Sequence, residues 1–149
     1  MTLVPALYAL GGFATARWIA DSAQSPSNAQ VIALGEVWLH TVCGHDPGAV
    51  TALYANDGVL VGTVAQTVKQ GHREIRKYFN TFLTKENLCG EFQTHIVQRY
   101  RGWAVDSGLY VFQWEENGKR VTLPARFSFV YRKTPHGWKI ANHHSSALP

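Results

Sequence analysis

The stretch VTLPARFSFVYRKTPHGWKIANHHSSALP, residues 121–149, decides the fold. Apolar and polar residues alternate from Leu123 to Tyr131, which is the period of a half-buried strand. A turn at Pro135-His136-Gly137 leads to a second strand, which runs from Trp138 into the cluster Asn142-His143-His144-Ser145-Ser146. The two segments predict an antiparallel hairpin that ends in polar side chains, and we expect part of any chemical site to lie there.

The sequence before this stretch predicts more antiparallel strands. Asn117-Gly118 is the strongest short hairpin signal, and it joins the strand just described to a strand-like segment over residues 104–115. Residues 92–101 alternate more loosely and predict a further strand. The second half of the chain therefore predicts a meander.

The first half predicts helices. A helix is expected to begin at Ser25-Pro26 and to end at Gly44, since apolar residues recur at helical spacing between them. Asp46-Pro47 predicts the start of a second helix, and residues 72–85 predict a third. Asn56-Asp57-Gly58 predicts a turn. Helices followed by a meander indicate an α+β fold rather than alternating βαβ units.

The composition of the chain limits the number of domains and the classes of partner that we expect. The chain has 149 residues, of which 46% are hydrophobic and 16% charged, so we expect one domain with its own core. The net charge of +4 comes from 14 basic and 10 acidic residues that are mostly scattered. Nucleic-acid binding usually shows a basic stripe with interleaved aromatic residues, so we expect no nucleic-acid partner.

The N-terminus allows two interpretations. Residues 2–16 are uncharged, mostly apolar and end in Ala14-Thr15-Ala16, which resembles the cleavage site of a secretory signal. However, no Lys or Arg precedes the apolar run, and the run is too short to span a bilayer. Residues 1–24 are therefore an apolar extension or a signal remnant, and residues 25–149 are the domain. A signal remnant implies a periplasmic or secreted protein, and an extension implies a cytoplasmic one.

Two cysteines permit one disulfide but no zinc site built on thiolates. Cys43 and Cys89 form a bond if the ends of the first and third helices converge, and otherwise they are two buried thiols. Because His143 and His144 are adjacent in a strand, their side chains point to opposite faces and do not form a two-histidine metal site. We therefore predict no metal and no cofactor.

Several short strings carry a family resemblance: Asp46-Pro47, 52–55, 57–60, Gly62-Thr63, Ile75, Tyr78-Phe79, 107–112, 125–131, 138–140 and 143–149. In this order they resemble the nuclear transport factor 2-like (SnoaL-like) superfamily, above all bacterial relatives of the calcium/calmodulin-dependent protein kinase II association (hub) domain. The resemblance covers about residues 30–149 and implies a cone-like curved antiparallel sheet wrapped around N-terminal helices. It also implies a pocket at the open end of the cone and a homodimer or larger homo-oligomer formed through the outer sheet face.

Arg126 is the first candidate for a binding residue. Alternation alone places Phe127 and Phe129 in the core and Arg126 in solvent. The resemblance implies the opposite, because an arginine that matches Arg126 lines the pocket of hub-like domains. A guanidinium in an apolar cavity needs an anionic partner, and its planar fork suits a carboxylate. We therefore expect a small carboxylate or polar ligand.

His144 is the second candidate, since it shares a strand face with Trp138 and Ile140; the alternative is a histidine that ties down the strand end. Trp38, Tyr54 and Tyr110 are candidate wall residues that could equally be core. Enzyme relatives place a general base after the first strand, but residues 61–64 contain no carboxylate or histidine.

Three functions remain open: an oligomerising small-molecule-binding domain, a small isomerase, cyclase or dehydratase that uses His144, and a purely structural assembly module.

Overall fold

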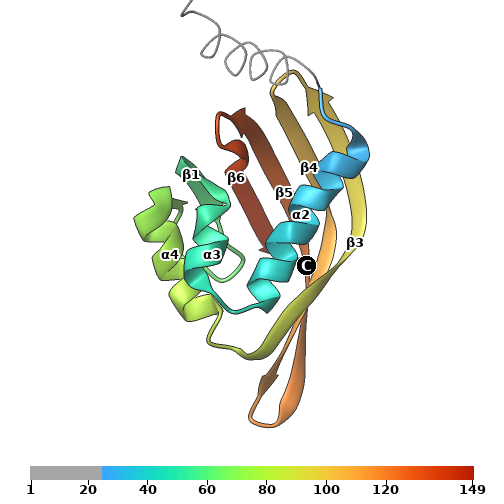
Figure 1. Cartoon of the computed structure of the whole chain (residues 1–149). Coiled ribbons are helices and arrows are strands. Elements are labelled where there is room, and N and C mark those ends of the chain that lie inside the picture. The colour runs from blue at the N-terminus through green and yellow to red at the C-terminus, as the bar shows by residue number, and fades with distance from the viewer. Residues whose placement is uncertain (1–24) are drawn as a thin grey trace, which may run out of the picture.

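The structure, a computed structural model, describes residues 25–149. Within this part of the chain, the helices are α2 (Asn28–Cys43), α3 (Pro47–Ala52) and α4 (Gly71–Phe82) (Figure 1). The strands are β1 (Tyr54–Val61), β2 (Lys69–Gln70), β3 (Glu86–Tyr100), β4 (Trp103–Glu116), β5 (Lys119–Thr134) and β6 (Gly137–Ala147). This order confirms the predicted α+β fold. The predicted N-terminal extension or signal remnant, residues 1–24, lies outside the described residues.

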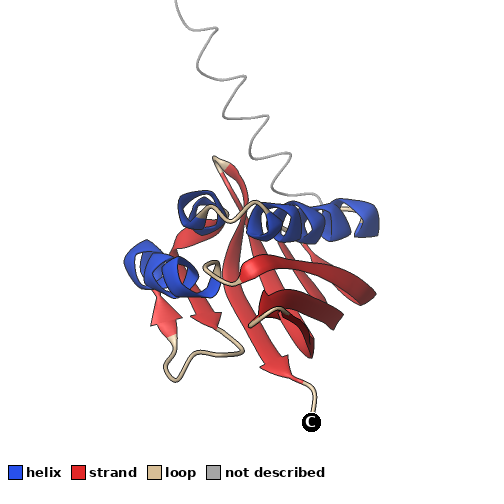
Figure 2. Ribbon diagram, turned by 90° about the horizontal axis from the view of Figure 1, so that it is seen from below, coloured by secondary structure: helices blue, strands red, loops and turns tan. Residues whose placement is uncertain are grey.

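The six strands form one curved sheet in the order β2-β1-β6-β5-β4-β3. The pair β1–β6 is parallel, and the other neighbours are antiparallel. The helices lie on one face of this sheet, which we call the inner face, and leave the outer face uncovered (Figure 2). None of the described helices has the length and apolar character needed to cross a membrane.

The first helix begins two residues later than predicted. Ser27 is its N-cap: the Ser27 hydroxyl accepts the backbone N–H of Gln30, and the Gln30 side chain accepts the backbone N–H of Ser27. This reciprocal capping box satisfies two N–H groups that the first turn leaves free. The helix ends at Gly44, as predicted, and Asp46 caps α3.

The predicted turn at Asn56-Asp57-Gly58 is instead part of β1. The pairing of β1 with β6 shifts register between Tyr54 and Val59, so these turn-forming residues occupy an irregular part of the strand. Asp57 is held there by Arg132, whose Nη2 lies 2.7 Å from a carboxylate oxygen of Asp57.

A bulge in β6 decides which polar residues face the core. Tyr131 pairs with Ile140 and Val130 pairs with Asn142, so Ala141 has no partner on β5. One extra residue reverses the alternation of side chains beyond it. Ile140 is therefore buried on the inner face together with His143 and Ser145, whereas His144 is exposed on the outer face.

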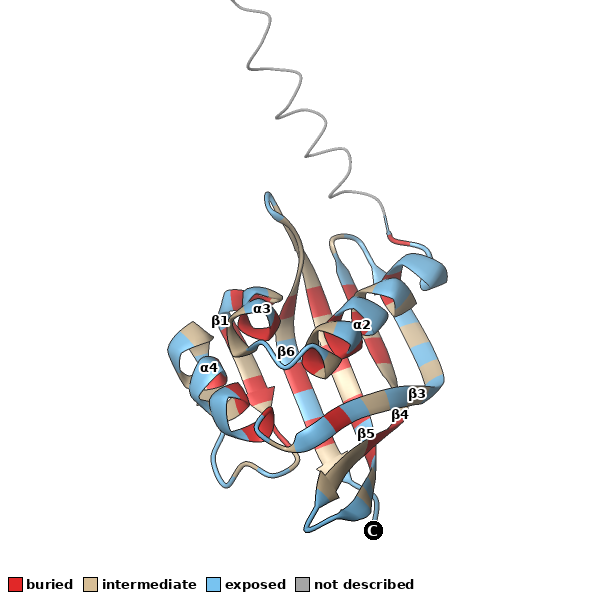
Figure 3. Ribbon diagram, turned by 60° about the horizontal axis from the view of Figure 1, so that its bottom comes forward, coloured by how far each residue is buried: buried red, intermediate tan, exposed pale blue. Residues whose placement is uncertain are grey.

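The core lies between α2, α4 and the inner face (Figure 3). Trp38 of α2 is at its centre, with its ring centroid 5.2 Å from that of Phe129 and 4.9 Å from that of His143. Phe127 and Phe129, which alternation predicted to be core, are buried. Aromatic side chains thus fill most of the space that the curved sheet encloses.

Candidate interior site

A buried histidine organises the polar groups of the core. The side chain of His143, on β6, is 2% exposed. Its Nδ1 lies 2.8 Å from the Tyr54 hydroxyl at the start of β1. The indole N–H of Trp38 donates to the same hydroxyl over 3.2 Å. Because Tyr54 accepts from Trp38, its own proton can be donated to Nδ1 of His143.

The other ring nitrogen of His143 continues this chain of hydrogen bonds. Nε2 lies 3.4 Å from the Tyr110 hydroxyl on β4, and Tyr110 donates to Ser145 Oγ over 2.5 Å. Ser145 in turn hydrogen-bonds Thr63, which follows β1. The protons are consistently placed if His143 is neutral, accepts at Nδ1 and donates at Nε2.

Burial fixes the protonation of these groups. Desolvation, followed by the nearby charge of His144, lowers the pKa of His143 from its ordinary value of 6.5 to about 3. Desolvation also raises the pKa of Tyr54 and of Tyr110 well above the ordinary value for a phenol. At neutral pH the cluster therefore contains a neutral imidazole and two protonated phenols. An imidazole with so low a pKa is a poor general base at neutral pH.

The space beside the cluster is small. A cavity of about 10 Å³ lies among Trp38, Tyr78, Tyr110, His143 and Ser145. This is close to the least volume that holds the centre of one water molecule. In this conformation the cavity that these residues line is too small for an organic ligand.

The structure brings three of the five predicted site residues together. Trp38, Tyr54 and Tyr110 all contact the His143 cluster. Arg126 and His144 instead lie exposed on the outer face. Arg126 is turned outward because its neighbours Ala125 and Phe127 are buried on the inner face, and its Nε donates to Ser146 Oγ over 3.0 Å. The expected pocket histidine is thus replaced by its neighbour, His143, because of the bulge at Ala141.

Sequence reasoning missed the roles of His143, Ser145 and Thr63. Alternation within residues 138–146 put His143 and Ser145 on one face, as the structure does, but identified it as the wrong face. No residue type marks Ala141 as a bulge. Phe127 and Phe129 on the neighbouring strand could have identified the inner face of β6. Residues that pair with a buried aromatic face must themselves face inward.

A second buried polar pair lies farther along the inner face. Asp106 lies within β4, in the segment that was predicted to be a strand, and is fully buried. Nδ1–H of His95 donates to Asp106 Oδ2 over 2.8 Å, and desolvation raises the pKa of this carboxyl. Asp106 Oδ1 and the Tyr131 hydroxyl are buried without a hydrogen-bond partner among the described residues.

Cys43 and Cys89 are joined in a disulfide, with their Cα atoms 4.5 Å apart. The bond ties the end of α2 to β3. Next to it, the His45 ring lies between the carbonyl oxygens of Leu83 and Leu88, at 3.0 and 2.8 Å. Within residues 25–149, no group of three or more histidine, cysteine, aspartate or glutamate side chains could hold a metal ion.

This architecture defines a class of protein, the nuclear transport factor 2-like superfamily: a curved sheet with helices on its inner face and a largely aromatic interior. Residues 27–149 match the model of the calcium/calmodulin-dependent protein kinase II association domain. The chain belongs to this family, as the resemblance predicted. No curated protein matches the chain.

Solved structures agree with the family assignment. The chain is similar to a Xanthomonas campestris protein described as a calcium/calmodulin-dependent protein kinase II association domain, with 39% identity and a TM-score of 0.78. The alignment covers 83% of this chain and 89% of that one. A Streptomyces avermitilis protein described as a dehydratase of the nuclear transport factor 2-like family is 18% identical, with a TM-score of 0.72 and coverage of 80% and 95%. A Novosphingobium aromaticivorans protein described as an aromatic ring hydroxylase is 22% identical, with a TM-score of 0.71 and coverage of 80% and 87%. These last two show the shared fold alone.

Proposed function

We propose that this chain is a self-associating domain that forms a homodimer or larger homo-oligomer through the outer face of its sheet. The observation that carries this proposal is the apolar surface on that face. Ile96, Tyr100 and Trp103 are 68%, 52% and 41% exposed. Exposed apolar side chains gathered on one face are typical of a protein–protein contact.

The charge pattern of the outer face suits association with an identical copy. The central row across β3, β4, β5 and β6 is Ile96, Ser107, Ser128 and His144, which contains no carboxylate, lysine or arginine. The next row contains a single charged residue, Arg126, beside Leu109 and Ser146. In a two-fold dimer a patch contacts its own copy, so these two rows bring few like charges together, whereas the row of Tyr100 and Trp103 continues to Arg132 and Lys139. We place Arg126 at this contact rather than in a ligand pocket.

The test is a substitution at the centre of the face. Ile96→Glu adds a charge where we place the contact and removes little packing, because the side chain is already mostly exposed. We expect the self-association constant to weaken by about 30-fold or more in sedimentation velocity, as for an interface hot spot. Val37→Glu is the matched control, since Val37 is 52% exposed on α2, on the other side of the sheet. Equal behaviour of the two variants would contradict the proposal.

The interior cluster favours a second function, small-molecule binding or catalysis inside the cone. His143, Ser145 and Thr63 add polar groups to an otherwise aromatic wall, which is the composition of many ligand sites. A ligand larger than water requires side chains to move first. Native mass spectrometry of protein purified gently from its own cells tests this function. If the interior binds a ligand, wild type should carry a small molecule that is released on denaturation. The Ser145→Val variant should lack that molecule. Protein that carries nothing supports self-association alone.

A further inference from the structure

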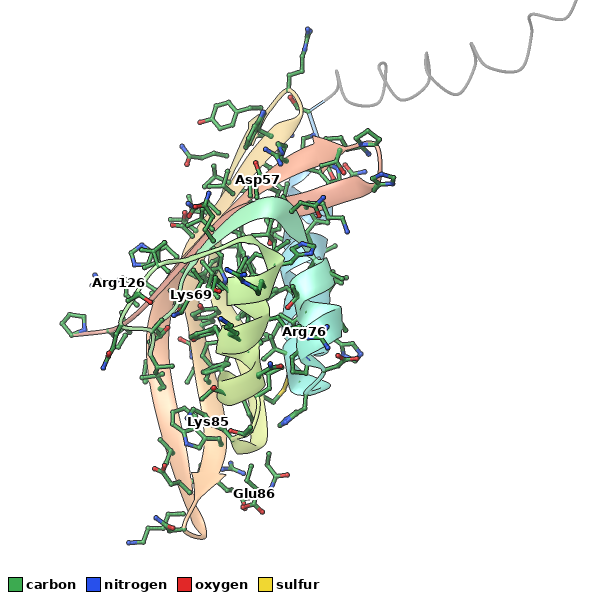
Figure 4. All side chains as sticks on the ribbon, turned by 90° about the vertical axis from the view of Figure 1, so that its left-hand side faces the viewer. Asp57, Lys69, Arg76, Lys85, Glu86 and Arg126 are labelled. Carbon is green, nitrogen blue, oxygen red and sulfur yellow. A yellow bond between two sulfur atoms is a disulfide. The ribbon has the colours of Figure 1, made fainter. Side chains whose placement is uncertain are left out.

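A basic groove runs along α4, outside the interior cavity. Its volume is about 340 Å³, and it lies between α4 and the segment that joins β1 to β2. Figure 4, in which α4 faces the viewer, shows Lys69 and Lys85 beside this helix. Lys77 completes a set of three lysines that line the groove, and none of the described residues lining it is acidic.

The three ammonium groups retain a positive excess. Lys77 lies 3.1 Å from Glu74, but Arg73 lies 3.2 Å from the same carboxylate, so one negative charge faces two positive ones. Lys69 donates to the Thr67 hydroxyl over 2.8 Å, a neutral partner. The Lys85 ammonium lies over the Trp114 ring, 5.0 Å from its centroid. A groove with this charge favours an anion.

The floor of the groove is apolar. The rings of Tyr78 and Phe82 are stacked, with centroids 5.5 Å apart and planes at 16°. Val64 lines the same groove and is 54% exposed. A flat hydrocarbon group placed on these side chains would be removed from water, whereas an inorganic anion would use only the lysines.

The same two rings separate the groove from the interior. Tyr78 and Phe82 line both the groove and the cavity beside His143. The Tyr78 ring lies directly over Gly62, so closely that a Cβ at position 62 would come within 2.6 Å of ring carbon Cζ. Glycine at this position therefore allows Tyr78 to form the partition.

From these observations we propose that the groove binds an organic anion, with its acid group toward Lys69, Lys77 and Lys85 and its apolar body on Tyr78, Phe82 and Val64. This site is separate from the outer face, so it holds whether or not the domain self-associates. It also differs from the expected site at Arg126, which lies on the outer face.

A pair of probes that differ mainly in charge tests the proposal. Naphthalene-1-acetate and its neutral amide, naphthalene-1-acetamide, are titrated into the full chain and followed by NMR. We expect the acid to bind more tightly and to shift the amide signals of Val64, Tyr78 and Thr81. The double variant Lys69→Gln/Lys85→Gln should weaken binding of the acid by about fivefold or more, since each exposed ion pair contributes up to about that factor, and should leave binding of the amide unchanged.

The matched control removes two charges elsewhere. Arg101→Gln/Lys119→Gln changes two exposed residues that do not line the groove, and it lowers the net charge by the same amount. We expect wild-type affinity for the acid in this variant. Equal affinity for the acid and the amide, equal weakening in both double variants, or shifts confined to another surface would each overturn the proposal.

Discussion

At the scale of single residues, His143 shows how burial sets chemistry. Its imidazole is surrounded by Trp38, Phe129 and two tyrosines, and the cost of placing a charge there lowers its pKa to about 3. The neutral ring is useful to the fold because it accepts from Tyr54 and donates to Tyr110, which satisfies both buried hydroxyls. The histidine is therefore best described as a connector of core hydrogen bonds.

The low pKa predicts how stability depends on pH. As pH falls through 6.5 the unfolded chain takes up a proton at His143, but the folded protein does not until pH is near 3. This group therefore destabilises the folded state by about 1.4 kcal/mol for each pH unit across that window. We expect wild type to lose about 2 to 3 kcal/mol more than His143→Gln when urea unfolding is compared at neutral pH and two units below 6.5.

A distant exposed histidine supplies the control for this experiment. His136 lies in the turn between β5 and β6, away from His143, so His136→Gln should keep the acid sensitivity of wild type. If His143→Gln loses as much stability on acidification as wild type, the imidazole is already charged in the folded state, and the description of the cluster is incorrect.

The sequence predicted the positions of some candidate site residues and not of others. The sequence pointed to Trp38, Tyr54 and Tyr110, because large aromatic residues in predicted core elements meet at the centre of a curved sheet. It pointed to the wrong member of the His143–His144 pair, since a one-residue bulge exchanges the two faces and has no compositional mark at Ala141. For Arg126, alternation predicted the exposed position that the structure shows, whereas the resemblance implied a pocket position.

At the scale of elements, the disulfide joins two parts of the structure that the sheet does not connect. Cys43 ends α2, and Cys89 lies 46 residues later in β3, which is an edge strand. A bond that closes a loop of this length restricts the unfolded chain and stabilises the fold by about 4 kcal/mol in the chain-entropy account. We expect Cys43→Ser/Cys89→Ser to unfold at markedly lower urea concentration than wild type.

The same bond can be tested without mutation. Thermal melts with and without a thiol reductant should differ for wild type and coincide for Cys43→Ser/Cys89→Ser. Alkylation shows which reductant concentration opens the bond. If the melting temperature of wild type does not change at that concentration, the disulfide does not contribute to stability.

Element boundaries followed local chemistry where that chemistry is strong. Gly44, Asp46-Pro47 and Asn117-Gly118 were each predicted to end or begin an element and do so. The failures occurred where tertiary contacts override a local preference. Asn56-Asp57-Gly58 has turn chemistry but lies in an irregular part of β1, between Tyr54 and Val59, which both pair with β6, and Asp57 forms an ion pair with Arg132.

At the scale of the whole molecule, the two faces of the sheet differ in what covers them. The inner face is covered by helices, whereas the outer face is uncovered (Figure 2). Aromatic side chains pack on the inner face, and exposed apolar residues lie on the outer face. The filled interior leaves little room for a ligand without movement of Tyr78. We propose that the domain self-associates through this outer face, in keeping with its membership of the association-domain family.

The mass of the full chain in solution tests this central claim most directly. One chain has a mass of 16.6 kDa. Native mass spectrometry and light scattering at micromolar concentration should give twice that mass or a larger whole-number multiple of it. Ile96→Glu should shift the population toward the single chain. A mass of 16.6 kDa for wild type across the micromolar range would contradict self-association through the outer face.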